Sequence, residues 1–241
     1  IMSRTKRFLL DLFFPNTCCI CGKLIDWDLF ICDECVSRLE FADERVCKNC
    51  GKAECICTEK LPYQRAETIF FYHGETAEKI RLFKVSPQMK NFGRYIGEKL
   101  SEKILEDVPD LKFDFVIPVP ESKESLKKKG FNQSEIIAKQ IAENLNCKVR
   151  TDLIVKNSGV RQHDLKTAKE RKINVETLFS LSNNENLTGK NIIICDDIIT
   201  TGSTLKKCAS LIKSLNPNYI MIAIGATAVF KELLENDAEK K

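Results

Sequence analysis

Residues 192–204, with the sequence IIICDDIITTGST, constrain the fold of this chain more than any other stretch. Three successive isoleucines predict a strand buried on both faces, which is typical of a parallel sheet covered by helices. Two adjacent acids, Asp196 and Asp197, end this apolar run. A turn rich in threonine then leads into residues 205–215, whose apolar side chains recur at helical spacing. The segment therefore predicts a strand, a turn and a helix, with polar groups gathered where the strand stops.

The turn before this helix has the features of an anion-binding site. The first N–H groups of a helix have no partner within it, and the helix dipole favours negative charge there. Gly202 allows a close approach of the backbone. Hydroxyl donors are supplied by Thr200, Thr201, Ser203 and Thr204. Because carboxylates repel a phosphate, Asp196 and Asp197 are expected to hold sugar hydroxyls or a Mg²⁺ ion on the same ligand.

A sugar phosphate satisfies both halves of this motif. The alternative is an ordinary buried strand with an acid-capped turn, but it needs neither both acids nor so many hydroxyls in one loop. The chain lacks the Gly-Lys-Ser/Thr ending of a Walker loop and the Rossmann fingerprint. Four apolar residues, Asp-Asp, two apolar residues and T-T-G-x-T resemble the phosphoribosyl-pyrophosphate (PRPP) signature of type I phosphoribosyltransferases. The resemblance implies that the acids hold ribose hydroxyls, that the turn holds the 5′-phosphate, and that Mg²⁺ accompanies PRPP.

Nine of the twelve cysteines lie between residues 18 and 57. Paired cysteines at this spacing are typical of structural zinc ribbons, in which four thiolates close a tetrahedral site and leave no position for water. The first expected site consists of Cys18, Cys21, Cys32 and Cys35. The second expected site consists of Cys47, Cys50, Cys55 and Cys57. The last pair of the second site has one intervening residue instead of two, so a degenerate ribbon with free thiols is the alternative.

The remaining cysteines, Cys147, Cys195 and Cys208, stand in apolar stretches, and Cys195 and Cys208 are expected to be small core residues. The N-terminal run FLLDLFFP is interrupted by an acid and closed by proline, which argues against a signal peptide and predicts a short amphipathic helix. We expect no membrane span and a cytoplasmic protein whose thiols are available for metal. The formal charge of +4 is small, so any surface that binds nucleic acid must be local.

Composition divides the chain into two predicted domains. Residues 1–62 form the cysteine-rich zinc ribbon, which has few apolar residues and needs metal to fold. Residues 63–241 alternate apolar strands with amphipathic helices, which predicts an α/β domain with a mostly parallel sheet and flanking helices, as in phosphoribosyltransferases. Each domain is expected to bury its own core, so that loss of Cys32 leaves the second domain folded. Expected strands cover residues 67–72, 113–119, 153–156, 177–181, 192–197 and 219–226, and expected helices cover 76–83, 92–106, 134–146 and 205–215.

A second ligand loop follows the expected strand at residues 113–119. In phosphoribosyltransferases the loop after this strand receives pyrophosphate, so the resemblance places that group at Val119, Pro120 and Glu121. A basic run and an aromatic ring beyond the loop are candidates for contacts with nucleic-acid phosphates and bases. These residues are Lys123, Lys127, Lys128, Lys129 and Phe131. The alternative for the basic run is a solvated helix face.

The cysteine ribbon, V-I-P-V-P, K-G-F-N-Q and D-D-I-I-T-T-G-S-T together resemble the ComF family of competence-associated proteins over nearly the whole chain. Residues 157–176 match the family pattern at Gln162, Leu165, Arg171 and Asn174. In this stretch Arg161 and Arg171 are expected to neutralise departing pyrophosphate. Lys129 stands where the family usually has arginine, which keeps the charge but loses the planar fork that grips phosphate.

The resemblance to ComF implies a protein that handles incoming single-stranded DNA in natural transformation and has a phosphoribosyl site, with a helicase-like competence protein as a candidate partner. One alternative is an active phosphoribosyltransferase that transfers a phosphoribosyl group from PRPP to an unidentified acceptor. Another is an interaction module whose phosphate site is vestigial. The intact acid pair argues against this last alternative, because a decayed site has no need of two carboxylates.

Overall fold

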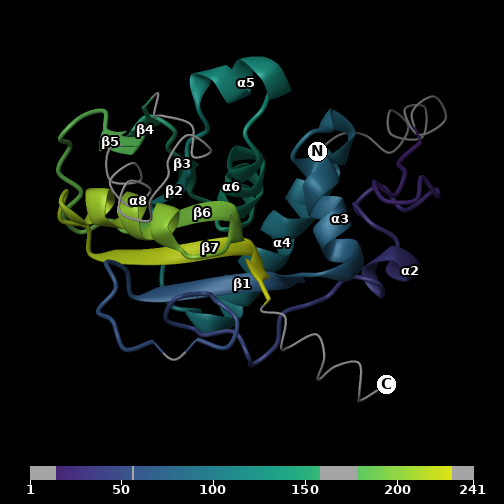
Figure 1. The fold of residues 1–241 in the computed structure, drawn as a ribbon, viewed down its shortest axis with the longest axis horizontal. Coiled ribbons are helices and arrows are strands. Elements are labelled where there is room, and N and C mark those ends of the chain that lie inside the picture. The colour runs from purple at the N-terminus through teal and green to yellow at the C-terminus, as the bar shows by residue number, and fades with distance from the viewer. Residues whose placement is uncertain (1–14, 56, 158–177, 230–241) are drawn as a thin grey trace, which may run out of the picture.

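The computed structural model describes residues 15–55, 57–157 and 178–229. Its centre is a five-stranded sheet with the order β1-β7-β6-β2-β3, in which every neighbouring pair is parallel (Figure 1). The strands are β1 (Arg65–Tyr72), β2 (Phe115–Pro118), β3 (Lys148–Val149), β6 (Asn191–Ile199) and β7 (Tyr219–Ala228). A separate antiparallel pair is formed by β4 (Ile154–Lys156) and β5 (Phe179–Leu181). The prediction of a mostly parallel sheet is confirmed.

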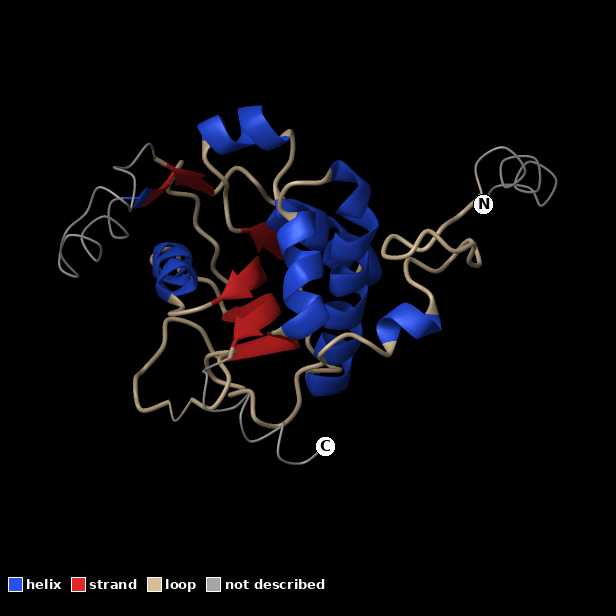
Figure 2. Cartoon of the chain, turned by 45° about the vertical axis from the view of Figure 1, so that its right-hand side comes forward, coloured by secondary structure: helices blue, strands red, loops and turns tan. Residues whose placement is uncertain are grey.

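The described helices are α2 (Asp33–Val36), α3 (Gly74–Phe83), the 3₁₀ turn η1 (Pro87–Met89), α4 (Lys90–Asp107), α5 (Lys123–Lys129), α6 (Gln133–Asn144) and α8 (Ser203–Lys213). Of these, α4 and α6 cover one face of the sheet and α8 covers the other. On β6, Ile193 and Cys195 are buried in one cluster with residues of α4 and α6, whereas Ile192 and Ile194 belong to a second cluster with residues of α8. Figure 2 shows the strands between a single helix on one side and the larger group of helices on the other.

The strand that carries the acid pair is longer than expected, and Asp196 and Asp197 lie inside β6 rather than at its end. Pairing with β7 continues through Ile198 and Ile199, which keeps the chain extended beyond the acids. The basic run forms helix α5. The expected N-terminal helix and the stretch with Arg161 and Arg171 lie outside the described residues. Within the described ranges, no helix is both long and apolar enough to cross a membrane.

The cysteine ribbon shares its core with the α/β domain. Cys18, Ile31 and Cys35 are buried in the same cluster as Phe70 of β1 and Phe92 of α4. The expectation that each domain has its own core is therefore wrong, because the ribbon has too few apolar residues to enclose its own metal-binding side.

Main-chain hydrogen bonds join the ribbon to the edge of the sheet. The Ala42 N–H donates to the carbonyl of Ile69 at 2.7 Å, and the Phe71 N–H donates to the carbonyl of Glu40 at 2.8 Å. These bonds pair residues 40–42 with β1, and Figure 1 shows the chain from α2 running directly to this edge. The ribbon is therefore fastened to the edge strand by backbone as well as by side chains.

The second half of the ribbon lies directly on the sheet. A Cβ on Gly51 would stand 2.3 Å from Cδ1 of Ile224 on β7, and the residue has a φ of +75°. Thr68 of β1 donates its hydroxyl to the Gly51 carbonyl at 2.9 Å. Only glycine allows both this backbone conformation and this close approach.

Candidate functional site

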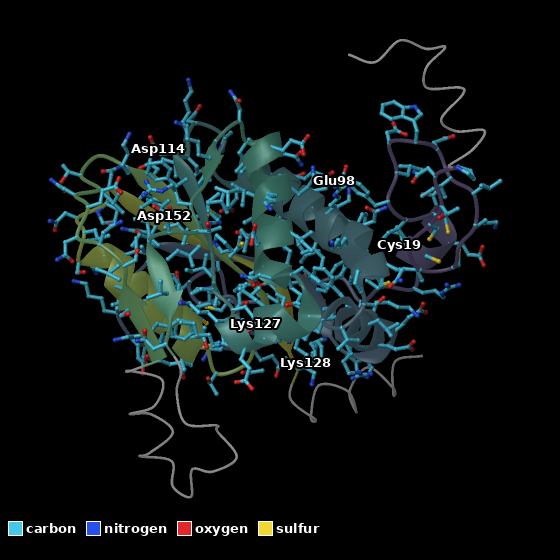
Figure 3. The ribbon with its side chains drawn as sticks, turned by 90° about the horizontal axis from the view of Figure 1, so that it is seen from above. Cys19, Glu98, Asp114, Lys127, Lys128 and Asp152 are labelled. Atoms are coloured by element: carbon cyan, nitrogen blue, oxygen red, sulfur yellow. The ribbon has the colours of Figure 1, made fainter. Side chains whose placement is uncertain are left out.

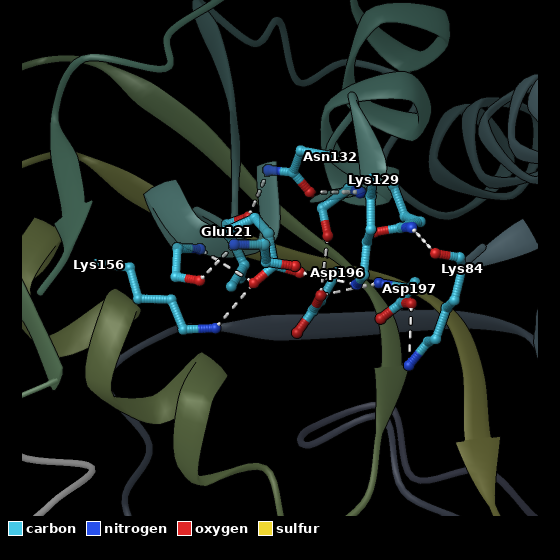
Figure 4. Close-up of polar contacts among 12 residues, drawn as sticks. Lys84, Glu121, Lys129, Asn132, Lys156, Asp196 and Asp197 are labelled. Atoms are coloured by element: carbon cyan, nitrogen blue, oxygen red, sulfur yellow. Dashed lines mark hydrogen bonds and ion pairs between the residues drawn. The ribbon is translucent and has the colours of Figure 1, made fainter. Parts of the chain in front are cut away.

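A cavity of about 400 Å³ opens at the carboxyl ends of β2 and β6 (Figure 4). In open parallel sheets this edge is where ligands bind. Its lining consists of Lys84, Val119, Pro120, Glu121, Lys129, Asn132, Gln133, Ser134, Lys156, Leu178, Phe179, Asp196, Asp197 and Thr204. The structure thus brings together the acid pair, the last threonine of the turn and the three residues predicted for the pyrophosphate loop.

The two acids of β6 have different surroundings. Asp196 accepts hydrogen bonds from the Ser134 hydroxyl and from the Asp197 N–H, both at 2.9 Å. Burial, and then the negative charge of Asp197, raise the pKa of Asp196 to about 7. A cation or a sugar hydroxyl that binds this carboxyl would favour its ionised form.

Lys84 neutralises the second acid, and sequence analysis did not assign it to the site. This residue caps the C-terminus of α3, and its ammonium lies 3.1 Å from Oδ2 of Asp197. The side-chain amide of Gln133 donates to the Lys84 carbonyl at 2.8 Å and fixes the backbone there. No local pattern marks Lys84, because tertiary packing brings it to Asp197.

The threonine-rich turn lies at the start of α8, and Thr204 reaches the cavity. Gly202 is the N-cap of this helix, with a φ of +79° and no side chain to satisfy the first N–H groups. A Cβ at Gly202 would meet Ile199 at 3.3 Å, so it would point into the protein. The expected cost there is backbone strain.

The predicted pyrophosphate loop carries a carboxylate bound by two lysines. Glu121 accepts a hydrogen bond from the Ser122 N–H at 3.0 Å, and lies 3.2 Å from the ammonium groups of both Lys129 and Lys156 (Figure 4). Burial alone would raise the pKa of Glu121, but this N–H and the two ammonium groups outweigh it and lower the pKa to about 2. Glu121 is therefore fully ionised at neutral pH.

Two cysteine clusters fit zinc. The sulfur atoms of Cys18, Cys21, Cys32 and Cys35 all lie within 4.8 Å of one another. In tetrahedral zinc sites, sulfurs are about 3.8 Å apart, which follows from Zn–S bonds of about 2.3 Å. The sulfurs of Cys21 and Cys32 are 3.7 Å apart. Burial raises the pKa of the Cys18 thiol, but N–H groups of Cys21, Cys32 and Ile20 lower it to about 6, which favours the thiolate that metal requires.

The second cluster contains three of its four predicted members. Cys47, Cys50 and Cys57 lie within 4.8 Å of one another, and the sulfur of Cys55 lies 3.7 Å from that of Cys57. Cys55 therefore lies beside the cluster, but its sulfur is not within 4.8 Å of all three of the other sulfurs. Cys195 and Cys208 are fully buried among apolar residues, as predicted for core cysteines.

A family model described as Phosphoribosyl transferase domain matches residues 91–233, which is more than half of the chain. The chain belongs to the phosphoribosyl transferase domain family. A second model, described as Double zinc ribbon domain, matches residues 9–67 and covers both cysteine clusters. Together with the cysteine clusters, this match supports structural zinc.

Relatives of this phosphoribosyl transferase family member carry names that refer to DNA utilization or competence. DNA utilization protein YhgH of Escherichia coli O6:H1 is 26% identical over 82% of this chain and 91% of its own. Competence protein ComFC of Bacillus subtilis (strain 168) is 26% identical over 76% of this chain and 77% of its own. These names and the two matched domains confirm the resemblance to the ComF family. The glutamine PRPP amidotransferase structure from B. subtilis aligns at a TM-score of 0.42 and 15% identity, over 60% of this chain and 30% of that one.

The residues predicted to contact nucleic acid do not form one surface in this phosphoribosyl transferase family member. Lys123, Lys127 and Lys128 are exposed on α5, and Figure 3 shows the last two on the face seen from above. Lys129 instead turns toward Glu121. Phe131 is only 8% exposed and packs against Phe83, with ring centroids 6.4 Å apart. The prediction that Phe131 stacks on bases is therefore wrong in this structure, because its ring belongs to the core.

Proposed function

We propose that the cavity binds a pentose 5-phosphate or PRPP and that the protein takes part in handling incoming single-stranded DNA. The proposal that the cavity binds a sugar phosphate rests on one observation: Asp196, Asp197 and Thr204 all line this cavity. Carboxylates suit the hydroxyl groups of a sugar, and the N-terminus of α8 suits its 5′-phosphate. Outside the two cysteine clusters, the described residues offer no group of three metal-ligating side chains, so Mg²⁺ would enter with oxygens of the ligand.

The DNA half of the proposal is supported by the relatives named for competence and DNA utilization and by the exposed lysines of α5. Cations that bind the phosphates of single-stranded DNA must be accessible to its flexible sugar-phosphate backbone. Lys123, Lys127 and Lys128 are exposed and therefore accessible. A cytoplasmic location and a helicase-like partner fit this role and stay predictions.

Ribose 5-phosphate should bind more tightly than 2-deoxyribose 5-phosphate, by about tenfold or more, because hydrogen bonds to a charged group contribute about 1.5–3 kcal/mol. The Asp197→Asn substitution should reduce this preference to about twofold or less, because a neutral amide replaces the charged carboxylate that accepts the hydrogen bond from the 2-hydroxyl group. Calorimetric titration of both sugars with Mg²⁺ present measures the two preferences.

Asp110→Asn is the matched control, because Asp110 is an exposed acid in the turn after α4. It should leave both affinities unchanged. A wild-type protein that binds neither sugar phosphate nor PRPP at millimolar concentration would refute the ligand half of the proposal.

Single-stranded DNA should bind with a steep dependence on salt, and replacing both Lys127 and Lys128 by alanine should flatten it. Each lost phosphate contact lowers the slope of log K against log salt by about 0.7, so the double variant should lose about 1.4. Fluorescence anisotropy with a short labelled oligonucleotide at several salt concentrations measures this slope. The variant keeps Lys129 and therefore the ion pair with Glu121.

Alanine at both Lys112 and Lys148 is the control for this pair. Both lysines are exposed near the amino ends of β2 and β3, at the opposite edge of the sheet from the cavity. If both double variants lost the same amount from the slope of log K against log salt, DNA binding would depend only on the total charge of the protein and not on α5.

A further inference from the structure

The ribbon presents large apolar side chains to solvent on residues 23–30, which we call the Trp27 loop. Leu24 is 68% exposed, Trp27 55% and Leu29 41%. Two backbone carbonyls of this loop, one of them that of Leu29, accept hydrogen bonds from the side-chain amide of Asn16 at 2.7 and 2.8 Å. A loop fixed in this way loses little conformational entropy when a partner covers it. An exposed tryptophan on such a loop is a typical anchor of a protein interface.

Acidic side chains flank the apolar residues of the Trp27 loop. Asp26 and Asp28 stand on either side of the tryptophan and are exposed, and in the described part of the chain neither lies within ion-pair distance of a basic side chain. Lys23 is the one cation of the loop, and it is paired with Glu34 at 3.1 Å. The loop therefore has a net negative charge around an apolar centre. This combination repels DNA phosphates and suits a groove that carries basic side chains.

The protein itself contains such a groove, with a volume of about 530 Å³, between α4 and α6. Phe131 and Ile136 line it with apolar atoms, and Lys90 and Arg94 line it from successive turns of α4. Both cations are exposed, and the structure describes no carboxylate within ion-pair distance of either one. The ammonium group of Lys90 lies 5.5 Å from the centre of the Phe131 ring. Cations beside an aromatic ring suit an indole, because tryptophan is the strongest cation–π partner among the side chains.

The carboxylates of this α4–α6 groove leave its positive end uncancelled. Glu135 is held by Lys139 at 2.7 Å. Glu143 lies about two helical turns further along α6, away from the end at which Lys90 lies over Phe131. No residue of the Trp27 loop of the same chain lines the groove. The acidic loop and the basic end of the groove are therefore complementary surfaces that one chain does not bring together.

We propose that the Trp27 loop of one copy of this chain docks in the α4–α6 groove of a second copy. Trp27 enters the groove with its indole against Lys90 and Arg94, and Asp26 and Asp28 lie close to the same two cations. An indole is smaller than the ligands that pockets of this volume hold. Because each copy carries both surfaces, a two-fold axis makes the contact twice and closes the assembly as a dimer. Neither surface contains a side chain proposed to hold the sugar phosphate.

Sedimentation velocity and intrinsic fluorescence at a series of protein concentrations test this contact. Trp27 is the only tryptophan of the chain, so its emission should shift to shorter wavelength as the protein associates. Trp27→Ala should weaken self-association by about tenfold or more, because the variant lacks the central anchor. Leu105→Ala is the matched control, since it removes an exposed apolar side chain of α4 outside both surfaces and should leave self-association unchanged.

Reversal of charge gives a second test that does not depend on the loss of one side chain. A loop variant with Asp26→Lys and Asp28→Lys and a groove variant with Lys90→Glu and Arg94→Glu should each remain monomeric, because like charges then face each other. All four residues are exposed, so both variants should fold. A mixture of the two should associate again, because the basic loop meets the acidic groove and the other contact is that of the wild type.

A wild type that stays monomeric at its highest soluble concentration would overturn the proposal, and so would a mixture of the two charge-reversed variants that does not associate. Self-association that Trp27→Ala leaves unchanged would also overturn it, because the copies would then meet through another surface. Quenching of the fluorescence of a monomeric wild type by single-stranded DNA would instead assign the loop to nucleic acid.

Discussion

Replacing Cys35→Ser is expected to destabilise the whole protein and not only the ribbon, lowering the free energy of unfolding by about 4 kcal/mol or more. Cys35 is fully buried, its sulfur belongs to the first cysteine cluster, and it lies in the same apolar cluster as Phe70 and Phe92. Loss of the metal therefore removes one wall of the core that supports β1 and α4. Chemical denaturation followed by far-ultraviolet circular dichroism, together with zinc analysis, measures the effect.

Cys19→Ser is the control for this prediction. Cys19 neighbours the cluster in sequence but is not one of its four members, so the variant should retain its zinc and most of its stability. Two separate transitions in Cys35→Ser, with the second unchanged from the wild type, would show that the α/β domain is independent of the ribbon after all.

Replacing Gly225→Val is expected to damage both the fold and the ligand site. Gly225 lies on β7 beside the acid strand, and a Cβ there would stand 2.6 Å from the backbone carbonyl of Asp197 and 3.3 Å from Ile96. A valine must push β6 away, which overpacks the sheet and should cost about 3 kcal/mol of unfolding free energy. Because Asp197 moves, the preference for ribose 5-phosphate over its 2-deoxy form should also fall. Thermal denaturation and the same calorimetric titration measure the two effects.

Ala228→Val, at the partly exposed end of the same strand, is the matched control, and both properties should be nearly unchanged. A stable Gly225→Val protein that still discriminates between the two sugars would show that Asp197 is not positioned by this contact.

Much of the fold follows from local patterns in the sequence. The isoleucine run before Asp196 predicts a strand buried on both faces, and the structure contains it because helices cover both sides of β6. The helix at residues 203–213 and the first cysteine cluster were likewise predictable, since helical periodicity and Cys-x-x-Cys spacing are properties of short segments.

The parts of the site that could not be predicted depend on contacts between distant segments. Lys84 ends a helix in the first half of the chain, and nothing in its neighbourhood signals that it pairs with Asp197. Lys129 belongs to a basic run whose other members are exposed, yet the end of α5 directs it to Glu121. Phe131 looks accessible beside lysines, but the fold places its ring against Phe83. Side-chain direction in such cases is set by packing, which sequence spacing does not specify.

The pairing of residues 40–42 with β1 also affects how the protein behaves among its own copies. β1 is an eight-residue edge strand with a largely apolar sequence, RAETIFFY, and an open edge of this kind is a template for intermolecular β-sheet growth. The ribbon covers part of that edge with its own backbone, while the opposite edge is the two-residue strand β3, which is too short to recruit another chain. Because the ribbon depends on thiolate ligands, we expect oxidation of the thiols or chelation of the metal to expose this edge of β1, so that the solubility of the protein would depend on its metal.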